Sequence, residues 1–346
     1  MASLEANPII PNRTIVEEVP GWLILYSDGT VERSGPPEAG PLLNPVAPYD
    51  EPRNGITVHD LTTDPPIRVY LPEGTTSPGQ RLPILLHFHG GGFCLSHPSW
   101  LLYHDFYAKL ATTLKVAAVL SPVYPLAPEH RLPAAIDSVF SALLWLRSVG
   151  TGEVKQMPVV ERLRETIDFS RVFLIGDSAG GNLVHEVCAR AGSVGPGLLH
   201  PVRVAGGILL NPGFARSKRS RSELENPESP FLNLEMIDKL LTLAVPAGAT
   251  KDHPYVCPMG KDAPAMEGLK MPPLLLVVGD KDLLRDPQLE YYEAMKKAGK
   301  EVELLMSHDM SHIFYLNKFA VEGDPVTGER TKELVQKIKM FVESDQ

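Results

Sequence analysis

Ser178 lies between two glycines in the stretch VFLIGDSAGG, residues 172–181, and this arrangement suits nucleophilic catalysis. An apolar run precedes the serine and a helix-like pattern follows it, which is typical of a nucleophile elbow rather than an ordinary tight turn. Such a turn is sharp, so the residues beside it must be small, and Gly176 and Gly180 meet that need. The helix that follows would point its amino terminus, where negative charge is favoured, at the serine.

A second glycine-rich stretch, LLHFHGGGF over residues 85–93, could supply hydrogen-bond donors for the same chemistry. Acyl transfer turns a carbonyl oxygen into an anion, and losing one donor to that anion raises the barrier by about 3–4 kcal/mol. We expect the N–H groups of Gly91, Gly92 and Ala179 to form this oxyanion hole. The alternatives are a plain turn or a phosphate-binding loop, but neither the GxGxxG nor the GK[ST] pattern is present.

A serine hydroxyl is a poor nucleophile at neutral pH unless a base takes its proton. In enzymes with such an elbow, an acid and then a histidine follow the serine along the chain. The histidines after Ser178 are His185, His200, His253, His308 and His312. We expect His185 to point away from the serine, because both would lie on one helix. Spacing favours His312 over His308, and both follow the last strand-like run.

The acid should come directly after the preceding strand-like run, where the stretch GDKDLLRD spans residues 279–286. A carboxylate there would hold the imidazole in the right tautomer and stabilise the imidazolium. Asp286 precedes Pro287 at the start of a helix-like pattern, so helix capping is its expected role. Spacing alone leaves the choice between Asp280 and Asp282 open.

Strand-like and helix-like segments alternate along most of the chain. The predicted strands are Ile56–Leu61, Ile67–Leu71, Pro83–Phe88, Val116–Ser121, Val172–Gly176, Val204–Leu210, Pro273–Val278 and Glu301–Met306. The predicted helices are Leu101–Leu114, Ala134–Arg147, Asn182–Ala191, Gln288–Ala298 and Thr331–Val342. Because the middle strands are continuously apolar, both of their faces should be covered. The alternation predicts an α/β fold with a mostly parallel central sheet flanked by helices.

Two segments interrupt this alternation and are expected to form a helical lid over the site. Residues 1–50 are rich in proline and glycine and predict an irregular arm, with a short amphipathic helix near Ile15 and a hairpin at residues 27–29. Residues 213–262 form an insertion before the acid-bearing strand, with one clear helix over residues 233–245. The basic segment of this insertion, residues 215–223, is expected to be a solvated loop.

Composition excludes several classes of function. The chain has 346 residues, 43% of them hydrophobic, and a net charge of −9, so nucleic-acid and anionic-membrane partners are not expected. No window reaches the roughly 18 apolar residues of a membrane span, and neither the CxxC nor the HExxH pattern of metal sites occurs. Three separated cysteines and a start without an apolar signal region predict a reduced, cytoplasmic protein.

Five motifs, taken in their order along the chain, resemble those of a known protein family. This resemblance adds to the arguments from spacing. HGGGF, YPLAPEHRLPAAIDS, GDSAGGNLVH, DLLRD and SHIFYLN together resemble plant carboxylesterases of the hormone-sensitive-lipase-like group, which have the α/β-hydrolase fold. The resemblance runs from about residue 56 to the end and includes the arm. It implies that the nucleophile is Ser178, the acid Asp282 and the base His312. It assigns a structural role to residues 129–131, the EHR of the second motif.

The resemblance implies one α/β-hydrolase domain over residues 1–346 that acts as a serine carboxylesterase on small, fairly apolar esters, without a cofactor or metal. Phe93, Phe214 and Ile313 are apolar, lie near the motifs and are expected to contact the substrate. One alternative is a dehydratase or a cyclising or eliminating lyase on the same scaffold, for which a base and an oxyanion hole can suffice. A receptor-like binding protein is a further alternative. A monomer and a homodimer both fit the sequence.

Overall fold

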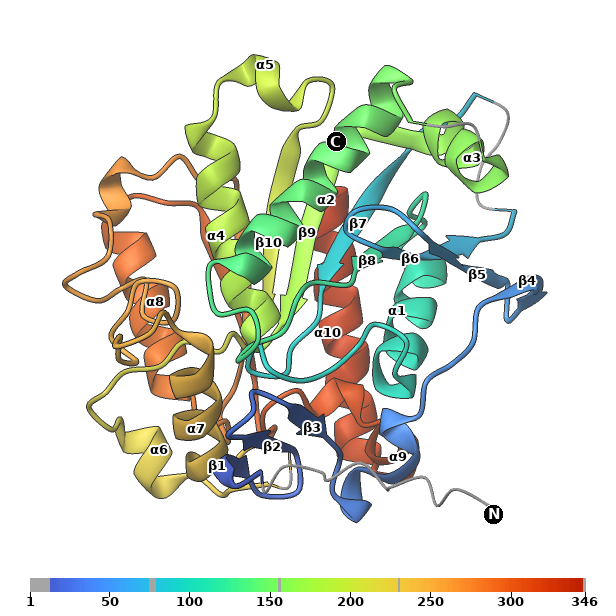
Figure 1. The fold of residues 1–346 in the computed structure, drawn as a ribbon. Helices are drawn as coiled ribbons and strands as arrows, with labels where there is room; N and C mark the ends of the chain where they lie inside the picture. The colour runs from blue at the N-terminus through green and yellow to red at the C-terminus, as the bar shows by residue number, and fades with distance from the viewer. Residues whose placement is uncertain (1–12, 75–78, 155–156, 230, 345–346) are drawn as a thin grey trace, which may run out of the picture.

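A nine-stranded sheet forms the centre of the computed structural model, which describes residues 13–74, 79–154, 157–229 and 231–344 (Figure 1). The strand order is β12-β11-β10-β9-β7-β8-β6-β5-β4, and the six strands from β12 to β8 are mutually parallel. The bounds are β4 Tyr49–Arg53, β5 Ile56–Leu61, β6 Ile67–Pro72, β7 Leu82–Phe88, β8 Val119–Pro122, β9 Ile167–Asp177, β10 Val204–Leu210, β11 Leu274–Gly279 and β12 Val302–Ser307. The predicted mostly parallel α/β sheet is confirmed.

Helices cover both faces of this sheet, and the alternation of side chains along each strand divides the core into two layers. On β9, Val172 and Leu174 pack into one cluster with α2 and α4, while Phe173 and Ile175 pack into the other with α1 and α10. Every residue of β7 and β11 is buried, as their continuous apolar runs predict. The helix bounds are α1 Leu101–Thr113, α2 Ala134–Thr151, α3 Pro158–Thr166, α4 Ala179–Ser193, α5 Pro196–Leu199, α8 Arg285–Lys297, α9 Lys318–Gly323 and α10 Pro325–Glu343.

The parallel strands bring distant parts of the chain to one edge of the sheet. Gly90 follows β7, Ser178 follows β9, Asn211 follows β10, Asp282 follows β11 and His312 follows β12. Because the carboxyl ends of parallel strands meet at the same edge, each of these loops can contribute to one site.

The N-terminal arm and the insertion lie together beside this edge (Figure 1). The arm forms a separate three-stranded sheet of β1 (Ile15–Val19), β2 (Leu23–Tyr26) and β3 (Val31–Arg33), and β1 contacts α7 (Leu234–Ala244) of the insertion. Lys239 on α7 donates a hydrogen bond to the carbonyl of Glu18. The hairpin at residues 27–29 is confirmed. The helix predicted near Ile15 is wrong, because this β-branched run pairs with β2; residues 1–12 of the arm lie outside the described residues.

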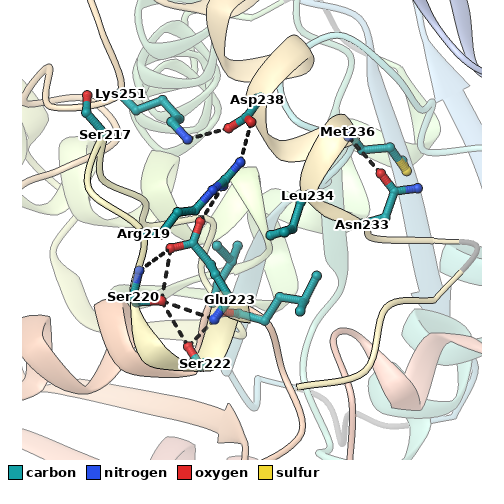
Figure 2. A network of polar contacts seen from close by, with 12 residues as sticks. Ser217, Arg219, Ser220, Ser222, Glu223, Asn233, Leu234, Met236, Asp238 and Lys251 are labelled. Carbon is teal, nitrogen blue, oxygen red and sulfur yellow. Dashed lines mark hydrogen bonds and ion pairs between the residues drawn. The ribbon is translucent and has the colours of Figure 1, made fainter. Parts of the chain in front are cut away.

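The basic segment of the insertion is not the solvated loop that its charge predicts. Arg219 forms ion pairs with both Glu223 and Asp238, and Lys251 also pairs with Asp238 (Figure 2). Ser220 and Glu223 form a capping box at the start of α6 (Arg221–Glu225). These contacts fix α6 against α7, because Asp238 lies on α7 and Glu223 on α6.

Residues 129–131 hold the arm and the insertion to the main body, which agrees with the structural role that the resemblance implies. Glu129 pairs with Arg33 of β3 at 2.5 Å. Arg131 donates hydrogen bonds to the carbonyls of Thr242 and Val245 at the end of α7, at 2.7 and 2.8 Å. All three cysteines are buried free thiols. Within the described residues, no helix is long and apolar enough to span a membrane.

Candidate active site

Ser178 occupies a strained turn between β9 and α4. Its φ of 51° and ψ of −121° are unusual for a residue with a side chain, and its N–H donates to the Leu210 carbonyl at 3.0 Å. A Cβ at Gly176 would come within 2.3 Å of the Gly180 oxygen, and one at Gly180 within 1.9 Å of the Phe88 oxygen. Both glycines are therefore needed for close backbone approach, as the motif predicts.

The glycine loop after β7 lies directly beside this turn. A Cβ at Gly90 would lie 3.1 Å from the Ser178 Cβ. Gly91 and Gly92 have φ values of 97° and 59°, which favour glycine. Among the hydrogen bonds between described residues, none uses the N–H of Gly91, Gly92 or Ala179 as a donor. Ala179 is the first residue of α4, where a helix leaves its N–H groups without internal partners.

His312 and Asp282 form a buried pair at the same edge. The Nδ1 of His312 lies 2.8 Å from Oδ2 of Asp282, and the two side chains are 4% and 0% exposed. Because an ionised carboxylate only accepts, Nδ1 carries the proton and Nε2 is left as an acceptor. Nε2 is buried and has no hydrogen-bond partner among the described residues. This nitrogen is available to take a proton.

The Asp282 carboxylate is held by further donors. Asn211 and Gln288 donate to Oδ2 at 3.1 and 3.0 Å, and the Leu284 N–H donates to Oδ1 at 2.9 Å. Burial alone would raise the pKa of Asp282, but His312 and the hydrogen bonds from Leu284 and Gln288 hold it below its usual value. The sequence analysis missed Asn211 and Gln288. The position of Asn211 directly after a buried strand was a usable signal, whereas nothing in the sequence marked Gln288.

The competing candidates pair with each other instead. Nδ1 of His308 lies 3.3 Å from Oδ2 of Asp280, and the His308 side chain is 69% exposed. Asp286 accepts the Ser222 N–H at 2.8 Å, so it binds the start of α6 rather than capping its own helix. His185 is buried on α4 with Nδ1 2.9 Å from the Tyr291 hydroxyl, away from Ser178 as expected.

A cavity of ≈ 80 Å³, the serine cavity, joins these groups. Ser178, Gly91, Gly92, Ala179 and His312 all line it. Most of its remaining wall is apolar and comes from the arm, the insertion, α1 and the loops at the sheet edge: Trp22, Leu43, Phe93, Leu95, Trp100, Leu102, Phe231, Leu232, Met236, Ile237, Leu240, Leu241, Leu284, Ile313 and Leu316. Ser96, Tyr103 and Asp177 add polar groups to it.

Two of the three predicted substrate contacts, Phe93 and Ile313, line this cavity, and the third does not. Phe214 is fully buried, with its ring centroid 4.4 Å from that of Tyr291 and beside His185. Phe214 is therefore not part of the cavity wall, because nearness to a motif in sequence does not fix the direction of a side chain.

Comparison with known proteins identifies the family of this chain. A family described by its alpha/beta hydrolase fold matches residues 85–316. The chain belongs to this family. A relative named probable carboxylesterase 6, from Arabidopsis thaliana, is 33% identical over 309 residues, which cover 87% of this chain and 85% of the relative. Tuliposide A-converting enzyme 1, chloroplastic, from Tulipa gesneriana is 33% identical over 333 residues, or 95% and 80% of the two chains.

The solved structure of an esterase from Pyrobaculum calidifontis is 26% identical in sequence and has a TM-score of 0.63. The match covers 83% of this chain and 84% of the esterase chain. The α/β-hydrolase fold and the resemblance to plant carboxylesterases are thereby confirmed, and the chain is a carboxylesterase-like α/β hydrolase.

The relatives' names also correct the predicted location. Tulip relatives are named chloroplastic or amyloplastic, which contradicts the prediction of a cytoplasmic location. The three free thiols argued only against a disulfide framework, and reduced cysteines do not identify one compartment.

Proposed function

We propose that this protein is a serine carboxylesterase that hydrolyses small, fairly apolar esters through an acyl-enzyme. One observation carries the proposal: Ser178 shares a cavity with three backbone N–H groups that donate to no described residue and with a histidine held by a buried carboxylate. This combination supplies a nucleophile, a base and donors for a developing oxyanion.

In the proposed reaction, Nε2 of His312 takes the Ser178 proton as Oγ attacks the ester carbonyl. The N–H groups of Gly91, Gly92 and Ala179 donate to the oxyanion of the tetrahedral intermediate, and Asp282 stabilises the imidazolium. His312 then protonates the leaving alkoxide as the C–O bond breaks. Water attacks the acyl-enzyme by the same route, which releases the acid and restores Ser178.

The arm and insertion are proposed to act as a lid, since Trp22 and α7 form part of the wall of the serine cavity. Apolar residues in these segments would exclude water from the ester and strengthen the electrostatic interactions of the site.

Substitution of His312, with His308 as the matched control, tests the assignment of the catalytic base. With p-nitrophenyl acetate and butyrate as substrates, His312→Ala should lower kcat by at least about 10³-fold, since removing a triad member has costs of this order. His308→Ala should retain activity, because His308 pairs with Asp280 at the exposed surface. The reverse result would refute the assignment of the base.

An intramolecular conversion is the second candidate. It is favoured by the mostly apolar wall of the serine cavity, which offers few hydrogen-bond partners to a water molecule, and by a relative that is named a converting enzyme. Turnover in H₂¹⁸O separates the two candidates. Hydrolysis incorporates one ¹⁸O into each released acid, whereas elimination or cyclisation incorporates none.

A further inference from the structure

A second and larger cavity adjoins the serine cavity across a shared wall. This polar cavity has a volume of ≈ 360 Å³ and shares Leu102, Phe231, His312, Ile313 and Leu316 with the serine cavity. Its other lining residues are Glu38, Leu42, Ser229, Asp309, Met310, Ser311, Phe314, Asn317, Ala320 and Thr327. It contains neither Ser178 nor the glycines of the loop after β7.

Polar and apolar residues line the polar cavity in nearly equal number, and its charged and amide groups distinguish it from the serine cavity. Among its described lining residues there are two carboxylates, Glu38 and Asp309, and no lysine or arginine. The nearby Arg330 is bound by both oxygens of Glu333. The side chains of Glu38, Asp309 and Ser311 and the Nδ2 of Asn317 make no hydrogen bond to any described residue. The cavity therefore offers free carboxylate acceptors, the hydroxyl groups of Ser229 and Ser311 and one amide donor, with a negative field.

The chemistry of ester cleavage directs one half of the substrate to this cavity. The leaving alkoxide must receive its proton from the histidine, so the alcohol oxygen has to lie against His312. Six consecutive residues around His312, 309–314, form one side of the polar cavity. The acyl carbonyl must instead lie between Ser178 and the glycine loop, in the apolar serine cavity.

We propose that the polar cavity binds the alcohol half of the ester and selects alcohols that carry hydroxyl groups and no negative charge. Hydroxyl groups can donate to Glu38 and Asp309 and accept from the Asn317 amide, whereas an anionic alcohol meets two carboxylates without a compensating cation. This inference rests on the proposed esterase function and adds the class of leaving group.

The test compares butyrate esters that differ only in the alcohol. The substrates are glycerol monobutyrate, O-butyryl glycolate as the anionic ester, butyrylcholine as the cationic ester, and p-nitrophenyl butyrate as a reference. We expect kcat/KM for the glycerol ester to exceed that for the glycolate ester by roughly tenfold or more at low salt. Two carboxylates, both partly exposed to water, would each repel the anionic alcohol.

The double variant Glu38→Gln/Asp309→Asn should reduce this ratio to about twofold, because it removes the two charges that oppose the anion. Both residues are exposed, and asparagine tolerates the φ of 62° at residue 309, so the fold should persist. The control is Glu301→Gln, an exposed charge before β12 at the opposite edge of the sheet, which should leave the ratio unaltered.

Three outcomes would overturn the inference. An unaltered ratio in the double variant would show that these carboxylates do not select the alcohol. Cleavage of butyrylcholine that is no faster than cleavage of the glycolate ester would show that the charges of the two carboxylates do not act on the alcohol half. A wild-type protein that hydrolyses p-nitrophenyl butyrate but shows no preference among alcohols would refute this subsite alone, whereas no turnover of any ester would refute the proposed function itself.

Discussion

The carboxylate of Asp177 connects the serine turn to the histidine loop, and two tyrosines allow that connection to be tested. Oδ1 of Asp177 accepts hydrogen bonds from the hydroxyls of Tyr107 at 2.8 Å and Tyr315 at 3.1 Å, while Oδ2 lies 3.0 Å from Nε2 of His87. Asp177 directly precedes Ser178. Tyr315 lies three residues after His312, and Tyr107 lies on α1.

The expected loss of stability follows from the number of donors that remain. Burial, and then the nearby Asp177, raise the pKa of both tyrosines well above the usual value, so both remain donors at neutral pH. A hydrogen bond to a charged group contributes about 1.5–3 kcal/mol. Tyr107→Phe or Tyr315→Phe alone should cost about 1.5 kcal/mol, because the other tyrosine still donates to Oδ1. The double variant leaves Oδ1 without a donor and should cost about 4–6 kcal/mol.

Urea unfolding of the two single variants and the double variant measures this coupling. Tyr292→Phe is the control, because Tyr292 is half-buried and its hydroxyl bonds to no described residue. With p-nitrophenyl butyrate, Tyr315→Phe should lower kcat more than Tyr107→Phe, since only Tyr315 lies on the histidine loop. Additive losses of stability, or equal effects on kcat, would refute the connection.

The remaining predictions concern the proposed acid, the elbow and a half-buried carboxyl. Asp282→Asn should lower kcat by up to about 10⁴-fold and Asp280→Asn should not; equal losses in steady-state kinetics would mean that the acid is misassigned. Gly180→Ala should abolish stable folding, because its Cβ would meet the Phe88 oxygen at 1.9 Å, and a soluble variant with native circular dichroism would contradict this. Burial raises the pKa of Glu186 to about 7. The folded state thus binds more protons than the unfolded state between about pH 4.5 and 7, and stability falls as pH rises through this window. Glu186→Gln should remove that fall, by up to about 3 kcal/mol in urea unfolding at pH 8 relative to pH 4, and an unaltered pH dependence would refute it.

The central strands were predictable because burial on both faces leaves a continuous apolar run. The prediction of β10 at residues 204–210 matches its observed bounds. The prediction of β7 differs by one residue at its start, and that of β11 differs by one residue at each end. The first strand of the arm was not predictable in this way. Its run IVEEV is short and exposed, and its pairing with β2 depends on contacts with a neighbouring segment.

The elbow and the glycine loop were predictable from the sequence because their backbone geometry requires glycine at specific positions. The proposed acid and base were harder to predict from spacing, because Asp280 and His308 are 28 residues apart and Asp282 and His312 are 30 apart. The structure separates the two pairs by burial, by the shorter distance between His312 and Asp282, and by the position of His312, unlike His308, in the wall of the serine cavity. The place of Phe214 outside the serine cavity was not predictable for a related reason, because its ring packs beside Tyr291 and His185, which are distant from it in the sequence.

Labelling with a fluorophosphonate, followed by peptide mass spectrometry, tests most directly whether Ser178 is an activated nucleophile. The proposed function predicts a single adduct, located on Ser178 and absent from Ser178→Ala, together with loss of p-nitrophenyl butyrate hydrolysis in step with labelling. A well-folded protein that forms no adduct and turns over no ester, or an adduct on another residue, would contradict it.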